Sequence, residues 1–346
     1  MVIKYDELKD LIKRAFLNAG IAEEKAEILA SVHADSTLKG VNSHGIDRVP
    51  KFIELIGKDL VDIDAEMELV NSFGAMENYD GNLGIGILNA LKASERATEL
   101  AKEYGIGLVG LRNTTHWMRG GLYTEKMAER GFIGLCWTNT ESIVPAWGAT
   151  SPSIGNNPLG IAIPAADGDI ALDMAMSQYS YGKLETTKLA GEDLPYPGGF
   201  DSDGNLTVDP AAIERTRRLL PIGYWKGSGL TIALDMIAAM MSNGNSTYDM
   251  DDDPRESFCT ACSQIFIAIN PEAFRTKESN DETIAKMKDS IHGAEAVDAD
   301  NATRYPGEGA SLREKQNKEF GMTIDDGIYE KVKNLQNKDK GLLQKS

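Results

Sequence analysis

The sequence predicts an α+β protein, with helices toward both ends of the chain and an antiparallel or mixed sheet in the middle. Apolar side chains recur three and four residues apart through residues 4–34 and 85–104, which is typical of amphipathic helices. Between residues 132 and 175, short apolar runs alternate with Gly, Asn and Pro, which favours short strands over repeated strand–helix–strand units. No G-x-G-x-x-G sequence follows a predicted strand, so we do not expect a standard Rossmann fold.

Bulk composition is that of an acidic globular protein. The 346 residues leave room for two domains with a sizeable core. A formal charge of −17, without Lys- or Arg-rich runs, argues against a nucleic-acid-binding surface. No segment reaches the roughly 18 apolar residues that span a bilayer, and the N-terminus carries charges where a signal peptide needs an apolar core. We therefore expect a cytoplasmic protein without a membrane partner.

The cysteines and histidines predict neither a disulfide framework nor a metal site. Cys136, Cys259 and Cys262 are too few and too unevenly placed for a set of disulfides. The spacing of Cys259 and Cys262 is that of half a zinc site or a redox pair, but no second Cys or His pair accompanies it. We interpret this spacing as a coincidence.

The helical and extended elements follow from periodicity and turn residues. Two helices are expected within residues 4–34, an extended stretch over 60–82, and a helix from Ile85 to Tyr104 that ends at Gly105, a suitable left-handed cap. Further along the chain we expect strands at 107–111, 132–138, 161–164, 170–175 and 264–269, helices at 122–130 and 230–241, and a charged helical remainder from residue 272.

The first candidate site is formed by His44 and Arg48, four residues apart ahead of an apolar helical segment. On a helix this spacing puts both side chains on one face. A histidine exchanges a proton near neutral pH, and an arginine binds a carboxylate through two parallel hydrogen bonds. A keto or hydroxy acid would need both groups if its carbonyl carbon exchanged a hydride. The alternative is a helix N-terminus capped by Ser43, with a solvated ion pair.

A second histidine, His116, falls between a predicted strand and a predicted helix. Side chains at such a junction face the end of a sheet, where open α/β proteins place their sites. The chain has only four histidines, which makes His116 a candidate acid–base group. The alternative is a structural histidine with satisfied hydrogen bonds.

A third candidate is the stretch Trp225-Lys226-Gly227-Ser228-Gly229, which precedes the predicted helix at 230–241. Glycines before a helix expose backbone N–H groups, and the helix dipole favours an anion there. Lys226 adds a full positive charge. The stretch therefore predicts a pyrophosphate site, although a glycine-rich helix start without a ligand is equally compatible with it.

Together these stretches resemble the family of NAD(P)-dependent malate/L-lactate dehydrogenases with a non-Rossmann fold. The matching features are Ser43-His44-Gly45 with Arg48, Asn113 with His116, Gly155-Asn156-Asn157-Pro158, Asp173-Met174-Ala175, Lys226-Gly227 and Pro306-Gly307-Glu308. The resemblance implies a cofactor domain on a largely antiparallel sheet, flanked by a helical part assembled from both chain ends. It also implies a homodimer with active sites near the subunit interface.

The same resemblance divides the chain and points to its cofactor contacts. Residues 1–112 would form the helical, substrate-binding part, 113–284 the NAD-binding domain, and 285–346 a helical segment that completes the first part. The implied cofactor contacts are Asp169, Ile170, Ala171, Leu172, Asp173, Met174, Ala175, Trp225, Lys226, Gly307, Glu308 and Gly309.

The cofactor is expected to be NAD, with NADH favoured over NADPH. Asp169 and Asp173 would repel a 2′-phosphate if they lie near the ribose. Lys183 and Lys188 could reach the same region, which leaves NADPH open.

For catalysis, the resemblance implies that His44 is the proton donor and Arg48 the carboxylate clamp. His116 is a catalytic or polarising partner, or else the acid itself. Within the family, the chain is most similar to members that reduce the C2 carbonyl of a 2,3-diketo sugar acid. The similar stretches are 116–121, 136–139, 197–201, 220–229 and 263–269, and the departures lie at 249–261 and in about the last 70 residues.

Two alternatives remain open at the level of function. The substrate could be another 2-keto acid, such as oxaloacetate, pyruvate, a ureidoglycolate-type compound or a cyclic imine carboxylate. A different class of protein, a non-catalytic dimer, would bind a small anion through Arg48 and Lys226 and would transfer no hydride.

Overall fold

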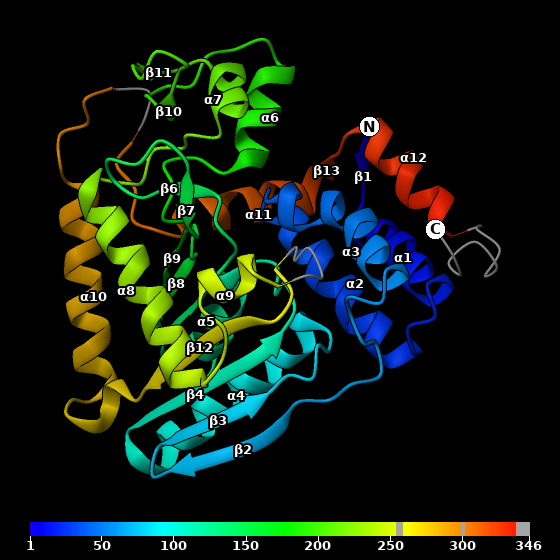
Figure 1. Cartoon of the computed structure of the whole chain (residues 1–346). Helices are drawn as coiled ribbons and strands as arrows, with labels where there is room; N and C mark the ends of the chain where they lie inside the picture. Colours follow the sequence, from blue (N-terminus) through cyan, green and yellow to red (C-terminus); the bar gives the residue numbers. More distant parts are fainter. Residues whose placement is uncertain (254–258, 299–301, 337–346) are drawn as a thin grey trace.

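The centre of the protein is a mixed sheet, which a computed structural model describes together with the rest of residues 1–253, 259–298 and 302–336 (Figure 1). In the described residues, neighbouring strands are antiparallel except for β3 and β4, which run parallel. This confirms the predicted non-Rossmann, largely antiparallel sheet. In spatial order its strands are β2 (Glu68–Phe73), β3 (Met76–Asp80), β4 (Ile106–Thr114), β12 (Cys262–Ile269), β5 (Ile133–Thr138), β8 (Leu159–Ile163) and β9 (Ile170–Met174).

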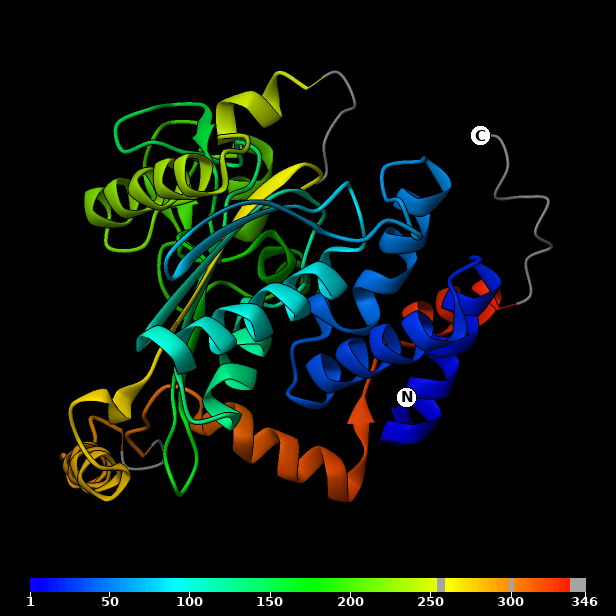
Figure 2. The same ribbon diagram turned by 90° about the horizontal axis from the view of Figure 1, so that it is seen from below.

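Helices cover both faces of this sheet, α4 (Gly86–Tyr104) and α5 (Gly120–Glu129) on one and α8 (Trp225–Ser242) on the other (Figure 2). Two consecutive residues of β5 show the alternation. Cys136 Sγ lies 3.2 Å from the Gly120 carbonyl oxygen of α5, whereas Trp137 Nε1–H donates to the Leu234 carbonyl of α8 at 3.0 Å. Successive side chains on a strand point to opposite faces, so the middle of the sheet is covered on both faces, whereas the residues of the edge strand β2 are exposed.

The two chain ends assemble one helical part, as the sequence predicted. Strands β1 (Val2–Ile3) and β13 (Met322–Thr323) pair antiparallel, and the N-terminal amine donates to the Ile324 carbonyl at 2.9 Å. Around this pair lie α1 (Tyr5–Asn18), α2 (Glu23–Leu38), α3 (Val49–Gly57), α11 (Glu308–Phe320) and α12 (Asp326–Leu335).

The helices form where the apolar spacing placed them. Helix α1 buries the stripe Leu8, Leu11, Ile12 and Phe16, which alternates with charged residues. Helix α4 ends at Gly105, whose φ of 83° is the left-handed cap that the sequence indicated. The apolar faces of both helices join the main core of the protein.

A smaller lobe, formed by residues from both before and after β9 in the chain, has its own apolar cluster, which includes Val144, Leu184 and Ile213. Its elements are β6 (Val144–Pro145), β7 (Pro152–Ile154), α6 (Tyr181–Leu189), β10 (Gly199–Phe200), β11 (Leu206–Thr207) and α7 (Pro210–Thr216). The remaining elements are the 3-10 helices η1 (Asn42–His44), η2 (Ile46–Arg48) and η3 (Pro271–Ala273), with α9 (Thr247–Asp251) and α10 (Lys277–His292).

Some boundaries differ from the predicted ones. Helix α8 begins at Trp225 rather than at Leu230, so Lys226 and Gly227 lie inside its first turn. Strand β4 and helix α10 run across the predicted domain boundaries at 112/113 and 284/285, and the division into domains stays a prediction. In the described part of the chain, no helix is both long and apolar enough to cross a membrane.

Candidate active site

The stretch with His44 and Arg48 is a broken turn rather than the single helix that the four-residue spacing suggested. His44 ends η1 and Arg48 ends η2, with Gly45 between them in a conformation that is neither helical nor extended, at φ −108° and ψ −126°. A Cβ at Gly45 would lie 2.2 Å from Thr37 Oγ1, so this approach requires glycine. Ser43 caps no helix; its hydroxyl lies 3.1 Å from His44 Nδ1.

Helix α2 holds this turn from behind. The Nδ1 of the fully buried His33 lies 2.8 Å from the Gly45 carbonyl oxygen, and the Ile46 N–H donates to Thr37 Oγ1 at 3.0 Å. The Nε2 of His33 is buried and has no hydrogen-bond partner among the described residues. Both contacts fix the backbone between His44 and Arg48, so the orientation of their side chains depends on α2.

His116 follows strand β4 and lies in a second tight turn. The Met118 backbone N–H donates to His116 Nδ1 at 3.0 Å, and Met118 adopts a left-handed φ of 69°. Because Nδ1 accepts a hydrogen bond, the neutral imidazole carries its proton on Nε2. Trp117, 1% exposed, anchors the turn by stacking on Tyr123 with ring centroids 5.3 Å apart.

The structure brings the two histidines together. The rings of His44 and His116 are stacked, with centroids 5.7 Å apart and planes 13° from parallel. Desolvation by the surrounding protein, then the charges of Arg48 and Arg119, lower the pKa of His44 to about 4. Desolvation, then Arg48, also lowers the pKa of His116 well below its usual value. Both imidazoles are therefore uncharged at neutral pH, when no anion lies beside them.

Arg48 supplies the positive charge of this cluster. No carboxylate of the described residues forms an ion pair with its guanidinium, which is only half-buried. Its field also reaches His33 and His116, whose pKa values it helps to lower. A cation without a partner, next to two neutral N–H donors, suits a carboxylate group with an adjacent carbonyl oxygen.

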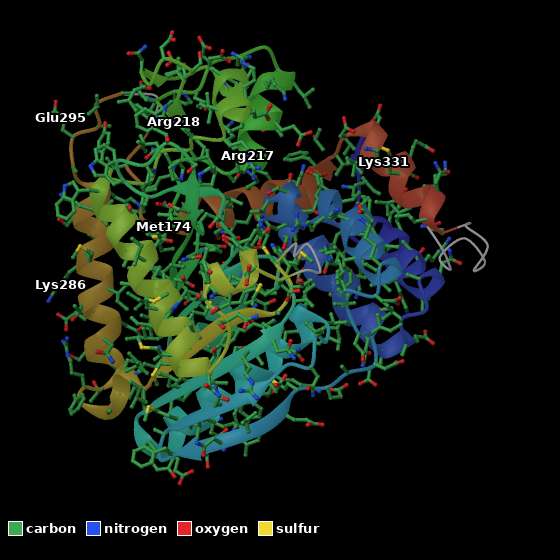
Figure 3. The ribbon with its side chains drawn as sticks, in the orientation of Figure 1. Met174, Arg217, Arg218, Lys286, Glu295 and Lys331 are labelled. Atoms are coloured by element: carbon green, nitrogen blue, oxygen red, sulfur yellow. The ribbon has the colours of Figure 1, made fainter. Side chains whose placement is uncertain are left out.

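The three predicted cofactor segments meet at strand β9. The Ala171 N–H donates to the Pro306 carbonyl at 3.0 Å, and a Cβ at Gly307, whose φ is 95°, would lie 3.0 Å from the Ala171 nitrogen. After β9, the Ile222 N–H donates to the Met176 carbonyl at 2.9 Å, just before α8. Met174, the last residue of β9, packs on the apolar cluster that includes Leu234 of α8 (Figure 3).

The acidic residues of these segments already have partners within the chain. Asp169 accepts from the Ala165 N–H at 3.0 Å, and Asp173 lies 3.5 Å from Arg119. Glu308 pairs with His292 at 3.0 Å and accepts from the Tyr305 N–H at 3.3 Å. The repulsion of a 2′-phosphate that the sequence suggested for Asp169 and Asp173 is thereby reduced.

At the start of α8, Gly227 packs against the preceding turn. Gly227 is buried, and a Cβ there would lie 2.1 Å from the Ile222 carbonyl oxygen, so this glycine serves close packing. Trp225 is 62% exposed, and Lys226 lies 6.0 Å from its ring centroid with no carboxylate partner in the described residues. Trp225 and Lys226 therefore remain an exposed aromatic surface and cation at the start of α8.

Sequence reasoning missed a set of partly buried charges between the two halves of the site. Arg119, 9% exposed, contacts Glu125 as well as Asp173, and Lys39 pairs with the same Glu125. Asp173 was a predicted cofactor contact and Arg119 lies in the similar stretch 116–121, but no motif joins them to each other, to Glu125 or to Lys39. Only the short spacing from Arg119 to Glu125 could have indicated a pair.

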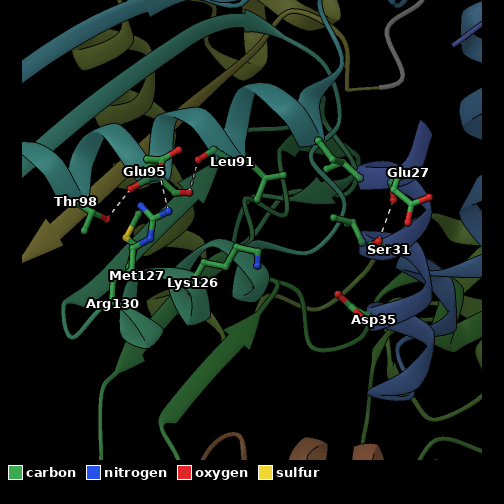
Figure 4. Close-up of a pocket in the computed structure, with 12 residues that line it drawn as sticks. Glu27, Ser31, Asp35, Leu91, Glu95, Thr98, Lys126, Met127 and Arg130 are labelled. Atoms are coloured by element: carbon green, nitrogen blue, oxygen red, sulfur yellow. Dashed lines mark hydrogen bonds and ion pairs between the residues drawn. The ribbon is translucent and has the colours of Figure 1, made fainter. Parts of the chain in front are cut away.

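Two further features, the cysteine motif and a cavity between helices, contribute none of the predicted site residues. Cys259 Sγ lies 3.1 Å from Glu141 Oε2, all three cysteines are free thiols, and no group of three or more potential metal ligands occurs among the described residues. A cavity of about 400 Å³ lies between α2, α4 and α5 (Figure 4), and none of the predicted site residues lines it.

Solved structures of similar fold define the class of protein. The malate dehydrogenase from Entamoeba histolytica superimposes with a TM-score of 0.91 at 25% identity, covering 97% of each chain. The sulfolactate dehydrogenase from Methanocaldococcus jannaschii superimposes with a TM-score of 0.86 at 32% identity, again over 97% of each chain. With this fold, the chain is an oxidoreductase acting on hydroxyl and keto groups.

The sequence comparisons identify the family within this class. A profile described as malate/L-lactate dehydrogenase matches residues 3–333. A 2,3-diketo-L-gulonate reductase from Pasteurella multocida is 44% identical over 335 residues, which cover 97% of this chain and all of the relative. The chain therefore belongs to the malate/L-lactate dehydrogenase family, as the resemblance indicated, and this dehydrogenase family points to a nicotinamide cofactor.

Proposed function

We propose that the protein catalyses the NADH-dependent reduction of the C2 carbonyl of 2,3-diketo-L-gulonate to 3-dehydro-L-gulonate. One structural observation carries the proposal. Arg48 has no ion-pair partner in the described chain, and its charge acts on the stacked pair of His44 and His116. The full-length relative named 2,3-diketo-L-gulonate reductase supports the choice of substrate.

Arg48 is proposed to hold the substrate carboxylate. A guanidinium binds a carboxylate with two parallel hydrogen bonds, which fixes both its position and its plane. The adjacent C2 carbonyl is then held in one orientation, and this removes much of the entropic cost of reaction. The broken turn at Gly45 supplies the rigidity, since α2 fixes its backbone on both sides of the glycine.

His44 is proposed to give the proton to the C2 oxygen, with His116 as its polarising neighbour. A neutral imidazole N–H stabilises the negative charge that develops on that oxygen. The bound carboxylate offsets the charge of Arg48, which is one of the causes of the low pKa of His44. Substrate binding therefore raises the pKa of His44 toward the range in which proton transfer is efficient.

The residues around β9 fit a nicotinamide cofactor. Gly307 leaves no room for a side chain against Ala171, and Trp225 and Lys226 offer a stacking surface and a cation. When bound, the nicotinamide supplies the hydride. The preference for NADH over NADPH rests on the carboxylates of Asp169, Asp173 and Glu308, whose residual field disfavours the 2′-phosphate of NADPH.

The substrate proposal is tested by following NADH absorbance with 2,3-diketo-L-gulonate, pyruvate and oxaloacetate, each also with NADPH. We expect the highest kcat/KM for 2,3-diketo-L-gulonate with NADH. A higher value for another keto acid keeps the dehydrogenase and refutes the substrate. No turnover with any of them, together with retained anion binding, favours a non-catalytic anion-binding dimer.

We also propose a homodimer, on the evidence of the exposed apolar side chains of α8 and β2. In α8 only Lys226 and Asp235 are charged, and all six residues of β2, the edge strand, are exposed. The exposed apolar side chains on the two elements are Trp225, Leu230, Ile232, Met236, Ile237, Met240, Met241, Leu69, Val70 and Phe73. A surface of this kind is typical of a subunit interface.

The dimer is tested by the mass of Met240→Glu in solution. Met240 is 70% exposed, whereas Met287 of α10 is 57% exposed outside this surface, so Met287→Glu is the matched control. We expect Met240→Glu to be a monomer and Met287→Glu a dimer; two dimers, or a monomeric wild type, refute the interface.

A cytoplasmic location is proposed as well, supported by the three free thiols.

A further inference from the structure

Arg119 is one of four charged side chains that alternate in sign, from Asp173 through Arg119 and Glu125 to Lys39. Its Nη2 lies 2.9 and 3.0 Å from the two carboxylate oxygens of Glu125, and its Nη1 lies 3.5 Å from Asp173. Lys39 pairs with Glu125 from the other side. Arg119 is 9% exposed, and the side chains of Glu125 and Asp173 are 14% and 22% exposed, so solvent screens these charges only in part.

The charges join three segments that the proposed function uses. Lys39 directly follows α2 and lies three residues before the turn of His44. Arg119 directly precedes α5 and lies three residues after His116. Asp173 belongs to β9, the strand to which the proposed cofactor contacts converge. A movement of any one segment relative to the others would separate charges in a poorly hydrated environment.

The position of Asp173 leaves little freedom in this arrangement. Its carboxylate accepts from the Gly121 N–H at the start of α5, where a negative charge also interacts favourably with the helix dipole. A Cβ at Gly121 would lie 2.7 Å from Asp173 Oδ2 and 2.9 Å from Arg119 Nη1. The close packing of backbone, carboxylate and guanidinium therefore requires glycine at 121.

We propose that Arg119 is a positioning residue that locks strand β9 to the turns of His116 and His44. The inference rests on the proposed function for its catalytic consequence. Through Asp173 the guanidinium holds the cofactor strand, and through Glu125 and Lys39 it holds the end of α2. The side chain of Arg119 thereby fixes the position of the cofactor strand relative to the turns that carry the two histidines.

Arg119 also acts on the histidines through its charge. The groups that face His44 are Arg48, Arg119, His33 and His116, and after desolvation and Arg48, Arg119 is the next cause of the lowered pKa of His44. Removal of this charge therefore raises the pKa of His44. A replacement that keeps the charge but shortens the reach leaves that pKa nearly unchanged and breaks only the lock.

The test compares Arg119→Met and Arg119→Lys with Arg130→Met, an exposed arginine of the same region that pairs with Glu95. The pKa values of the four histidines are measured by NMR titration, assigned with His44→Ala and His116→Ala. NADH affinity is measured by fluorescence, and kcat and KM are measured with 2,3-diketo-L-gulonate. The titration does not depend on turnover.

We expect Arg119→Met to raise the pKa of His44 and to lower kcat by about 10²-fold through misplacement of the reacting groups. Arg119→Lys should lower kcat but leave the pKa of His44 unchanged. Arg130→Met should change neither kcat nor that pKa. A titration of Arg119→Met that matches the wild type, or a kcat that matches it, overturns the inference.

Two further measurements keep the inference testable. If Arg119→Met does not fold, Glu125→Gln serves instead: it leaves the guanidinium in place and removes the carboxylate between Arg119 and Lys39, so kcat falls while the pKa of His44 does not rise. If the wild type turns over no keto acid, the proposed function fails. The titration and the affinity of Arg119→Met for NADH then decide the inference.

Discussion

The two halves of the proposed active site differ in how their charges are used. On the substrate side, Arg48 has no ion-pair partner among the described residues and the neighbouring histidines are neutral. On the cofactor side, Asp169, Asp173 and Glu308 are each held by a partner within the chain. On the substrate side, Arg48 is therefore available to bind an anion. On the cofactor side, the groups proposed to bind the cofactor are backbone atoms, glycines and the side chain of Lys226.

The largest expected effect sharpens the substrate side of this comparison. His44→Ala should lower kcat by about 10²–10⁴-fold, the usual contribution of a general acid. Its affinity for NADH, measured by fluorescence, should equal that of the wild type. His116→Ala should retain more activity, because its ring only polarises and supports that of His44. The opposite order of the two variants would transfer the proton donor to His116.

The next effect concerns the arginine without a partner. Arg48→Gln should raise KM for the keto acid by roughly 10- to 100-fold, the worth of a charge-assisted hydrogen-bond pair. Arg48→Lys keeps the positive charge but cannot make two parallel hydrogen bonds, so its KM should lie between those of the wild type and Arg48→Gln. Arg14→Gln, an exposed arginine of α1, is the control. A KM that stays at the wild-type value with Arg48→Gln would place the carboxylate elsewhere.

A third prediction concerns His33, which supports the turn of His44. Desolvation lowers the pKa of His33 from 6.5 to about 4 in the folded chain. Between those values the unfolded chain binds more protons, so this contribution to stability is fully present above pH 6.5 and is lost as the pH falls toward 4. The loss at about pH 5 is about 2 kcal/mol.

His33→Asn removes this titration and keeps a side-chain N–H near the Gly45 carbonyl. Urea unfolding of the wild type and the variant at about pH 7 and about pH 5 measures the difference. The variant should lose about 2 kcal/mol less than the wild type between the two conditions. Equal losses would show that His33 is not the group that destabilises the fold in acid.

The smallest effect lies on the cofactor side. Asp169→Asn should change the ratio of kcat/KM for NADH and NADPH by about threefold or less, since one carboxylate oxygen already holds the Ala165 N–H. A tenfold or larger gain for NADPH would mean that Asp169 faces the ribose directly, and the contrast between the two halves would not hold.

Local patterns predicted most of the fold but only part of the site. Amphipathic periodicity located α1 and α4, and the turn residues between short apolar runs indicated an antiparallel sheet. The His44–Arg48 spacing was taken as one helix, because nothing local shows that Gly45 lies against Thr37 in a non-helical conformation. The pairing of Arg119 with Asp173 depends on how β9 packs against α5, and no short motif encodes such a contact.

The most direct test of the proposed reaction follows the hydride itself. NADH with deuterium at both C4 positions is incubated with the enzyme and 2,3-diketo-L-gulonate, and the product is examined by NMR. Hydride transfer to the carbonyl beside the carboxylate held by Arg48 predicts that deuterium appears at C2. Deuterium at C3, or consumption of NADH without deuterium in the sugar acid, would contradict the proposed reaction.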